Sequence, residues 1–150
     1  AGKASSTPTM LGYQAEGAAP FIKGSRVEKP ETIATAIRIG NPQSWDQALK
    51  LSKESNGWFD SFSDKEILAT QKLLTEKEGI FCEPASAISV AGALRDIKSG
   101  KIPDHSSVVC TLTGHGLKDP DTAISQCDTG AMININPTLD EVKKAILDNM

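Results

Sequence analysis

A hydroxyl residue that directly follows an apolar, β-branched run is the first feature of this sequence that could do chemistry. Residues 108–112 read Val-Val-Cys-Thr-Leu, and Thr113 and a Gly-His-Gly turn over 114–116 come next. A run this apolar predicts a strand covered on both faces, as in a parallel sheet. Ligands of open α/β sheets bind at the carboxyl ends of such strands, so Thr113 would reach a site. A tight strand-to-loop corner without a ligand would explain the same pattern.

A second candidate is Glu83, which stands before Pro84 and a run of small residues. Proline fits the first turn of a helix because its missing amide donor is not needed there, so a helix is expected over about 84–98. Its alanines, serines and glycine would allow close packing against a sheet or a cofactor-bearing wall. Glu83 is placed at the cap of this helix, and capping alone would account for it.

The elements that must position these residues are predicted from capping and periodicity. Capping-box patterns begin at Ser44 and Ser63 and predict a helix over about 45–55 and a second helix that Gly79 ends. Thr138 is expected to cap a last helix. Strands are expected over 10–15, 59–62 and, at an edge, 132–135, with a turn over 119–121. Helices that alternate with strands at this spacing indicate the α/β class.

The composition of the chain argues against nucleic-acid binding, membrane association and metal binding. The 150 residues, 39% of them hydrophobic, suffice for one ordinary core, and a net charge of −3 offers no basic surface for nucleic acid. No apolar run approaches the roughly 20 residues that span a bilayer. We therefore expect no membrane partner, and we expect a cytoplasmic location. The three cysteines, Cys82, Cys110 and Cys127, lie far apart in the sequence, and neither histidine stands at metal-ligand spacing from them. We therefore expect no metal site.

Four stretches in order resemble the C-terminal part of the threonine synthase family. They are Gln-Ala-Glu-Gly-Ala-Ala-Pro over 14–20, Pro-Glu-Thr-Ile-Ala-Thr-Ala-Ile-Arg-Ile-Gly-Asn-Pro over 30–42, Glu-Pro-Ala-Ser-Ala over 83–87 and Leu-Thr-Gly-His-Gly-Leu-Lys-Asp over 112–119. The resemblance implies that residues 1–150 form the C-terminal part of a tryptophan-synthase-β-like fold. In that fold an open, mostly parallel sheet is covered by helices in three layers.

The resemblance also implies an activity and a set of cofactor contacts. The family uses pyridoxal phosphate to convert O-phospho-L-homoserine and water to L-threonine and phosphate, and the full-length parent would be a homodimer. Thr113 would face the pyridine nitrogen, Glu83 would lie near the ring, and Ala36 would belong to a loop beside it. Spacing alone leaves Thr111 open in place of Thr113, because residues two apart in a strand share a face. His115 would shape its turn.

Two parts of the family pattern have no counterpart in this sequence. The family's Schiff-base lysine lies in a Phe-Lys-Asp-Arg-Gly-like segment, and a glycine-rich loop holds the cofactor phosphate. We therefore expect no catalytic residue here and no activity of the chain alone. One alternative is a serine or threonine dehydratase of the same fold, although these tend to carry Thr-Ile-Ala-Asp-Gly where residues 32–36 read Thr-Ile-Ala-Thr-Ala. Another is a noncatalytic folding or interaction lobe.

Overall fold

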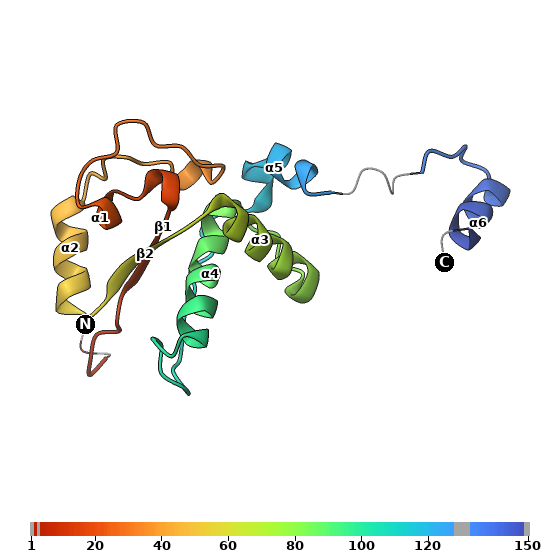
Figure 1. Cartoon of the computed structure of the whole chain (residues 1–150). Helices are drawn as coiled ribbons and strands as arrows, with labels where there is room; N and C mark the ends of the chain where they lie inside the picture. Colours follow the sequence, from red (N-terminus) through yellow and green to blue (C-terminus); the bar gives the residue numbers. More distant parts are fainter. Residues whose placement is uncertain (1, 3, 128–132, 149–150) are drawn as a thin grey trace. The chain divides into compact units, whose positions relative to one another are not determined.

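The computed structural model describes residues 2, 4–127 and 133–148, and it divides the chain into two compact units (Figure 1). The first unit is Ala1–Pro120 and the second is Asp121–Met150. The first contains both strands and the predicted site residues. In the described part of the chain, none of the helices has the length and apolar character needed to cross a membrane.

A small parallel sheet lies at the centre of the first unit. Strand β1 (Leu11–Ala15) pairs with β2 (Trp58–Phe62), with Leu11 opposite Trp58 and Ala15 opposite Phe62. Parallel neighbours need a crossover connection, and helix α2 (Trp45–Glu54) lies in the chain between them. The strands predicted over 10–15 and 59–62 are confirmed within a residue at their ends.

Helices contact the sheet from both sides, which confirms the α/β class. Phe59 and Phe62 are three positions apart in β2 and so face opposite sides. Phe59 stacks on Phe21 of helix α1 (Pro20–Lys23), with ring centroids 4.4 Å apart. Phe62 packs with Ile88 of helix α4 (Pro84–Lys98), and helix α3 (Asp64–Glu78) lies beside α4 (Figure 1). The sheet thus has α1 and α2 on one side and α4 on the other.

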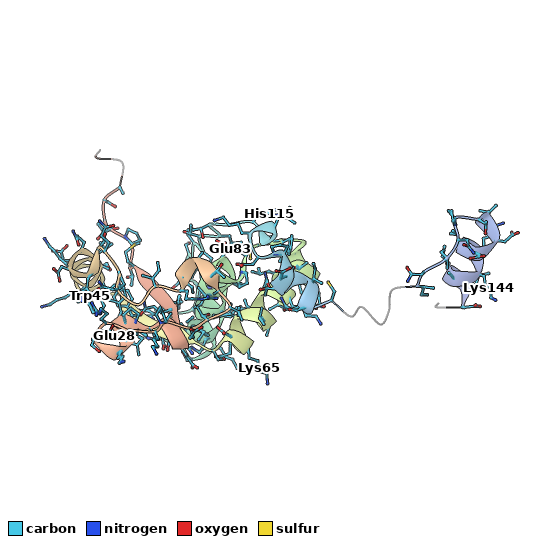
Figure 2. All side chains as sticks on the ribbon, turned by 90° about the horizontal axis from the view of Figure 1, so that it is seen from above. Glu28, Trp45, Lys65, Glu83, His115 and Lys144 are labelled. Atoms are coloured by element: carbon cyan, nitrogen blue, oxygen red, sulfur yellow. The ribbon has the colours of Figure 1, made fainter. Side chains whose placement is uncertain are left out.

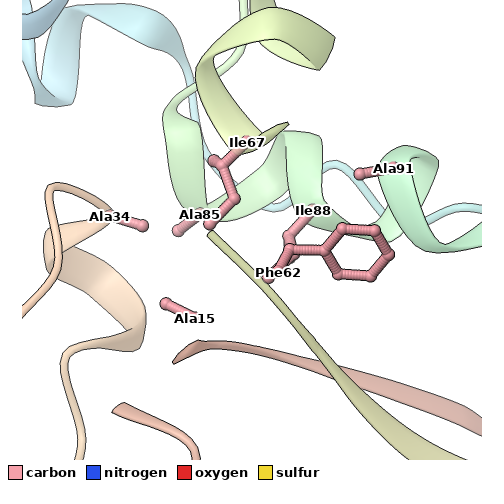
Figure 3. Close-up of a cluster of buried hydrophobic side chains, with 7 residues drawn as sticks. All are labelled: Ala15, Ala34, Phe62, Ile67, Ala85, Ile88 and Ala91. Atoms are coloured by element: carbon pink, nitrogen blue, oxygen red, sulfur yellow. The ribbon is translucent and has the colours of Figure 1, made fainter. Parts of the chain in front are cut away.

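The main core joins both strands to α3 and α4. Phe62 and Ile67 are fully buried large side chains, and four alanines and one isoleucine complete the cluster (Figure 3). These are Ala15, Ala34, Ala85, Ile88 and Ala91. Small side chains on α4 allow its backbone to approach the strands closely, as the predicted small-residue helix requires. The first turn of α4 is thereby fixed over the carboxyl ends of β1 and β2.

Capping residues in the sequence predict where several helices begin or end. Ser63 accepts a hydrogen bond from the Glu66 amide while the Glu66 carboxylate accepts one from the Ser63 amide, so the second predicted capping box is confirmed. Gly79 ends α3 with φ 67°. The first predicted box is wrong: Ser44 precedes α2, but its side chain makes no cap hydrogen bond. Its ψ of 41° is not the extended geometry that aims an N-cap side chain at the following amides.

The strand predicted over 108–112 is wrong for this chain. The described residues there form no strand, and Val109 is 91% exposed. The physical reason is the lack of a neighbour, since β1 and β2 pair only with each other and no ladder reaches this run. Close to this run, Cys82 and His115 form an isolated antiparallel bridge.

Two helices form the regular structure in the described residues of the second unit. Helix α5 (Pro120–Ser125) begins where a turn over 119–121 was predicted, since Pro120 can start a helix at its first position. Of the predicted edge strand, residue 132 lies outside the described residues, and 133–135 form no strand. Helix α6 (Leu139–Leu147) is confirmed, and the Thr138 side chain accepts a hydrogen bond from the Glu141 amide at its start.

A buried carboxylate ties α4 to both strands. Asp96 is 2% exposed, and its Oδ2 accepts hydrogen bonds from the Tyr13 hydroxyl at 2.7 Å and from Trp58 Nε1 at 2.8 Å. Tyr13 belongs to β1 and Trp58 to β2, so one oxygen fixes three elements. Burial, and then the hydrogen bond to Asp96, raise the pKa of Tyr13 well above its ordinary value.

The raised pKa predicts how the stability responds to alkaline pH. Above about pH 10 the unfolded chain releases the tyrosine proton while the folded chain keeps it, so this contribution to stability falls as pH rises. Because Tyr13 is the sole tyrosine, absorbance near 295 nm reports it directly. Tyrosinate is expected to form well above pH 10 in the native chain and near pH 10 in urea. Coincident midpoints would contradict the buried network.

Candidate functional site

The loop at Thr113 is held on the first turn of α4. The Glu83 amide donates to the Gly114 carbonyl at 3.0 Å, and the Gly114 amide donates to Ser86 Oγ at 2.9 Å. Ser86 Oγ also lies 3.2 Å from Thr113 Oγ1, within hydrogen-bond distance. These hydrogen bonds hold the loop on α4, and Thr113 stays exposed. Thr113 reaches this place from a segment without regular secondary structure and not from the predicted strand.

Glu83 lies beneath this loop with its carboxylate buried. The residue is 1% exposed, and within the described residues its Oε2 has no hydrogen-bond donor. The Lys118 ammonium lies 3.8 Å from this oxygen, which is an ion-pair contact. Glu83 occupies the N-cap position of α4 and Pro84 its first turn, as predicted, but the Glu83 side chain makes no cap hydrogen bond. Capping therefore does not explain why a carboxylate is buried here.

Gly114 makes room for that carboxylate. A Cβ atom built on Gly114 would lie 2.1 Å from Glu83 Oε1 and 2.3 Å from its Cδ. No side chain fits between the loop and the carboxylate, so glycine is required for this close approach. The Glu83 carboxylate therefore lies directly against the backbone that carries Thr113.

His115 has a structural place in the turn. Its Nδ1 accepts a hydrogen bond from the Leu117 amide at 3.2 Å, at the start of the short 3-10 helix η3 (Gly116–Lys118). Its ring meets Phe81 edge-on, with centroids 5.4 Å apart. Figure 2 shows His115 and Glu83 at neighbouring places on the first unit. These contacts agree with a role in shaping the turn.

Ala36 comes from a third stretch of chain, the 3-10 helix η2 (Thr35–Ile37), and is exposed. Asp64 holds the approach to η2, because its carboxylate accepts hydrogen bonds from the Thr32 hydroxyl and the Ile33 amide. At the other side, the Thr35 hydroxyl lies 3.0 Å from both Asp119 carboxylate oxygens. This contact connects η2 to the segment that follows Thr113.

The structure thus links the three predicted site residues through their neighbours. Glu83 and Thr113 are connected by the contacts of Gly114 and Ser86. Helix η2, which carries Ala36, is connected to the same loop by the hydrogen bond of Thr35 with Asp119. The sequence analysis assigned no individual role to Ser86 or Lys118, and it placed Gly114 in the Gly-His-Gly turn. Ser86 could have been found from its spacing of three after Glu83, which places both on the first turn of α4. Lys118 gave no local signal.

Replacing Ser86 with alanine tests how the loop is held. The Gly114 amide would lose its acceptor, so the free energy of unfolding is expected to fall by about 1 to 3 kcal/mol in urea titrations. Ser99→Ala at the C-cap of the same helix is the matched control, because Ser99 is exposed and its hydroxyl donates to the nearby Asp96 carbonyl of α4. A Ser86→Ala loss no larger than that of the control would contradict the role of Ser86.

Known proteins resemble this chain in sequence and in fold. Residues 1–114 match the family described as "Pyridoxal-phosphate dependent enzyme". The threonine synthase of Synechocystis sp. is 50% identical over 145 residues, which cover 97% of this chain and 37% of that protein. The threonine synthase of Halalkalibacterium halodurans is 50% identical over 149 residues, which cover 99% and 40%. The chain therefore spans about two fifths of the length of these relatives.

A solved structure shares the fold. The fungal L-serine ammonia-lyase from Rhizomucor miehei superposes with a TM-score of 0.60 at 18% identity, covering 78% of this chain and 41% of that one. At this identity the likeness concerns the fold alone. It agrees with the α/β class, in which a parallel sheet is packed between helices.

Proposed function

Because this chain belongs to the pyridoxal-phosphate-dependent enzyme family, we propose that it is the C-terminal portion of a threonine synthase and forms one wall of the cofactor site. The observation that carries the proposal is the packing of the loop with Thr113 and Gly114 against Glu83 at the start of α4. Relatives about 50% identical along nearly the whole chain carry the name threonine synthase, which supports this activity over others of the same fold.

The residues present fit a bound pyridoxal ring on this side. A buried carboxylate oxygen of Glu83 lacks a hydrogen-bond donor within the described residues, and an unsatisfied buried acceptor is costly unless a ligand satisfies it. Thr113 adds an exposed hydroxyl, which can either donate or accept. Ala36 adds a small exposed side chain against which a flat ring can lie. Together they would hold the ring, while other parts of the enzyme hold its phosphate.

In this proposal the Thr113 hydroxyl would hold the ring nitrogen by a hydrogen bond. A hydroxyl is neutral, so it satisfies the nitrogen without forcing a proton onto it, as a carboxylate would. Ser86 lies 3.2 Å behind the Thr113 hydroxyl and is itself fixed by the Gly114 amide, so the hydroxyl is held in place before a ligand arrives. Pre-positioned groups of this kind lose little entropy on binding.

Glu83 and Lys118 act together at the edge of the site. The Glu83 carboxylate would accept a hydrogen bond from a donor on the bound group, and Lys118 at 3.8 Å offsets its negative charge. When bound, pyridoxal phosphate supplies the electron storage on which the reaction depends. The substrate class is a phosphorylated amino acid, O-phospho-L-homoserine, which is converted with water to L-threonine and phosphate.

The experiment that tests this proposal measures cofactor retention. This chain alone is expected to lose added pyridoxal phosphate on desalting, because the family's Schiff-base lysine segment has no counterpart in it. A chimera in which this chain replaces the matched region of the Halalkalibacterium halodurans relative is expected to retain one cofactor per chain. Stoichiometric retention by the chain alone would contradict its role as one wall of the site.

Loss of the cofactor from a folded chimera would contradict the proposal itself. Thr113→Ser is the conservative variant and should keep the retention, because it keeps the hydroxyl. Thr113→Val keeps the shape and removes the hydroxyl, so it should weaken retention by about tenfold, the effect of one hydrogen bond near 1.4 kcal/mol. Equal retention by the two variants would remove Thr113 from the site.

A further inference from the structure

One hydrogen bond joins two segments that are far apart in the sequence and that carry or adjoin the candidate site residues. The Thr35 hydroxyl donates to the Asp119 carboxylate, both of whose oxygens lie 3.0 Å away, and 84 positions separate the two residues. Thr35 is the first residue of η2, which also carries Ala36. Asp119 ends η3, the short helix that follows the Thr113 loop. The pair therefore connects the two segments that would face the ring.

The segment of η2 is anchored to the body of the first unit independently of this pair. Ala34, directly before η2, is fully buried in the main core, and Ile37, at the end of η2, packs against that core. The Arg38 guanidinium donates two hydrogen bonds to the Thr32 carbonyl, at 2.9 and 2.6 Å. The chain on both sides of η2 is thus held from behind.

The segment of η3 has its own anchors near the start of α4. The Gly116 amide donates to the Phe81 carbonyl at 3.1 Å, just before the residues that lead into α4. Lys118 of η3 forms the ion pair with Glu83 at 3.8 Å. The next residue, Asp119, contacts η2. Helix η3 therefore connects the start of α4 with η2.

The Thr35–Asp119 contact is exposed, which decides what it can contribute. An exposed polar contact adds little to global stability, because water competes for both partners. A hydroxyl bond to an ionised carboxylate is nevertheless stronger than one between neutral groups. Its two segments are anchored separately, so forming the contact orders little more of the chain. Its main effect is to fix one segment relative to the other.

We propose that Thr35 and Asp119 are positioning residues that set the separation between η2 and the Thr113 loop, and with it the space that a ring would occupy against Ala36 and Thr113. Neither residue contacts the ring, because both act through their neighbours. This inference rests on the proposed function, since only a bound cofactor gives that separation a consequence. Breaking the pair leaves both segments folded and holds a bound ring less tightly.

Hydrogen exchange in the chain alone tests the connection without a cofactor. Thr35→Val is expected to speed exchange of the Lys118 and Asp119 amides in η3 about tenfold. Asp119→Ala is expected to speed exchange of the Ile37 and Arg38 amides in η2 by about the same factor. A contact that fixes two segments must transmit its loss from one to the other. Faster exchange confined to the segment that carries the substitution would overturn the inference.

Conservative variants separate the hydrogen bond from the change of side chain. Thr35→Ser keeps the donor and Asp119→Asn keeps an acceptor oxygen, so both should keep the protection of both segments. Thr9→Val and Asp104→Ala are the matched controls, because both residues are exposed and lie elsewhere in the first unit. Effects of Thr35→Val and Asp119→Ala no larger than those of the controls would contradict the pairing.

Cofactor affinity of the chimera, measured by dialysis, tests the positioning role. Thr35→Val and Asp119→Ala are each expected to weaken the affinity for pyridoxal phosphate about tenfold, and the double variant no further, because each change breaks the same contact. The exchange of the two residues, Thr35→Asp with Asp119→Thr, again places a hydroxyl opposite a carboxylate and should recover most of the affinity. Additive losses without recovery in the exchanged pair would overturn the inference.

The failure of this inference differs from the failure of the proposed function. A folded native chimera that retains no cofactor would refute the proposed function. Native retention that neither Thr35→Val nor Asp119→Ala changes would refute the positioning role alone. Hydrogen exchange in the chain alone needs no chimera, so it decides whether the pair connects η2 and η3 in either case.

Discussion

Gly114→Ala is expected to lower the rate of threonine formation by the chimera at least about 100-fold, the scale of a misplacement near 1 Å at a reacting centre. The added Cβ would lie 2.1 Å from Glu83 Oε1, so the carboxylate or the loop must move. Either movement displaces Thr113, because Thr113 and Gly114 share the contact with Ser86. Steady-state assays of phosphate release measure the effect directly.

The double variant separates steric from chemical effects. Gly114→Ala alone should lower the free energy of unfolding by about 2 kcal/mol through overpacking. Adding Glu83→Ala removes the group that the new Cβ meets, so stability should recover while activity stays low. The two changes are then coupled, as expected for residues in contact. A Gly114→Ala chimera that keeps more than half of the activity would contradict the packing of this loop on Glu83.

Asp96→Ala is expected to lower the free energy of unfolding by about 3 to 5 kcal/mol, a large part of the stability of a small domain. The change leaves two donors, the Tyr13 hydroxyl and Trp58 Nε1, without their shared acceptor. The strands would lose this attachment to α4, while Arg95 of α4 would keep its contacts with the Ser61 carbonyl and the Asp60 carboxylate of β2. Urea unfolding followed by tryptophan fluorescence measures the loss, because Trp58, one of the two tryptophans, belongs to the network.

Two variants serve as controls for this effect. Asp96→Asn keeps an oxygen that can accept from both donors, so it should cost about 1 kcal/mol. Asp104→Ala removes an exposed carboxylate and should leave stability within about 0.5 kcal/mol. Equal losses for Asp96→Ala and Asp96→Asn would mean that the hydrogen bonds to Tyr13 and Trp58 do not carry the stability.

Local sequence signals predicted the elements that depend on local physics. The capping box at Ser63, the end of α3 at Gly79 and the start of α4 at Pro84 follow from neighbouring residues alone, and each is confirmed. The same pattern failed at Ser44, because the backbone there has a different ψ that no sequence pattern reports. The order and register of β1 and β2 depend on long-range pairing, which spacing does not encode.

The error at residues 108–112 has a physical cause of a different kind. An apolar pattern reports what a segment buries when all its partners are present, whereas a ladder forms only with the strands that the chain contains. For the candidate site, the motifs gave Thr113, Glu83 and Ala36, and the structure brings Thr113 and Glu83 together at Gly114. The ion pair of Lys118 with Glu83 connects residues 35 positions apart, so only the fold could reveal it.

The most direct measurement of the central proposal is product analysis of the chimera with two substrates in separate reactions. With O-phospho-L-homoserine, the account predicts L-threonine and phosphate in equal amounts, at a rate that Thr113→Ser keeps and that Gly114→Ala lowers at least about 100-fold. With L-serine, it predicts no pyruvate or ammonia above the rate of the Gly114→Ala chimera. The account would be contradicted if the chimera formed pyruvate and ammonia from L-serine but no threonine from the phosphorylated substrate, because these products identify a dehydratase. It would also be contradicted by a folded, cofactor-loaded chimera that is inactive on both substrates, which would identify a noncatalytic lobe.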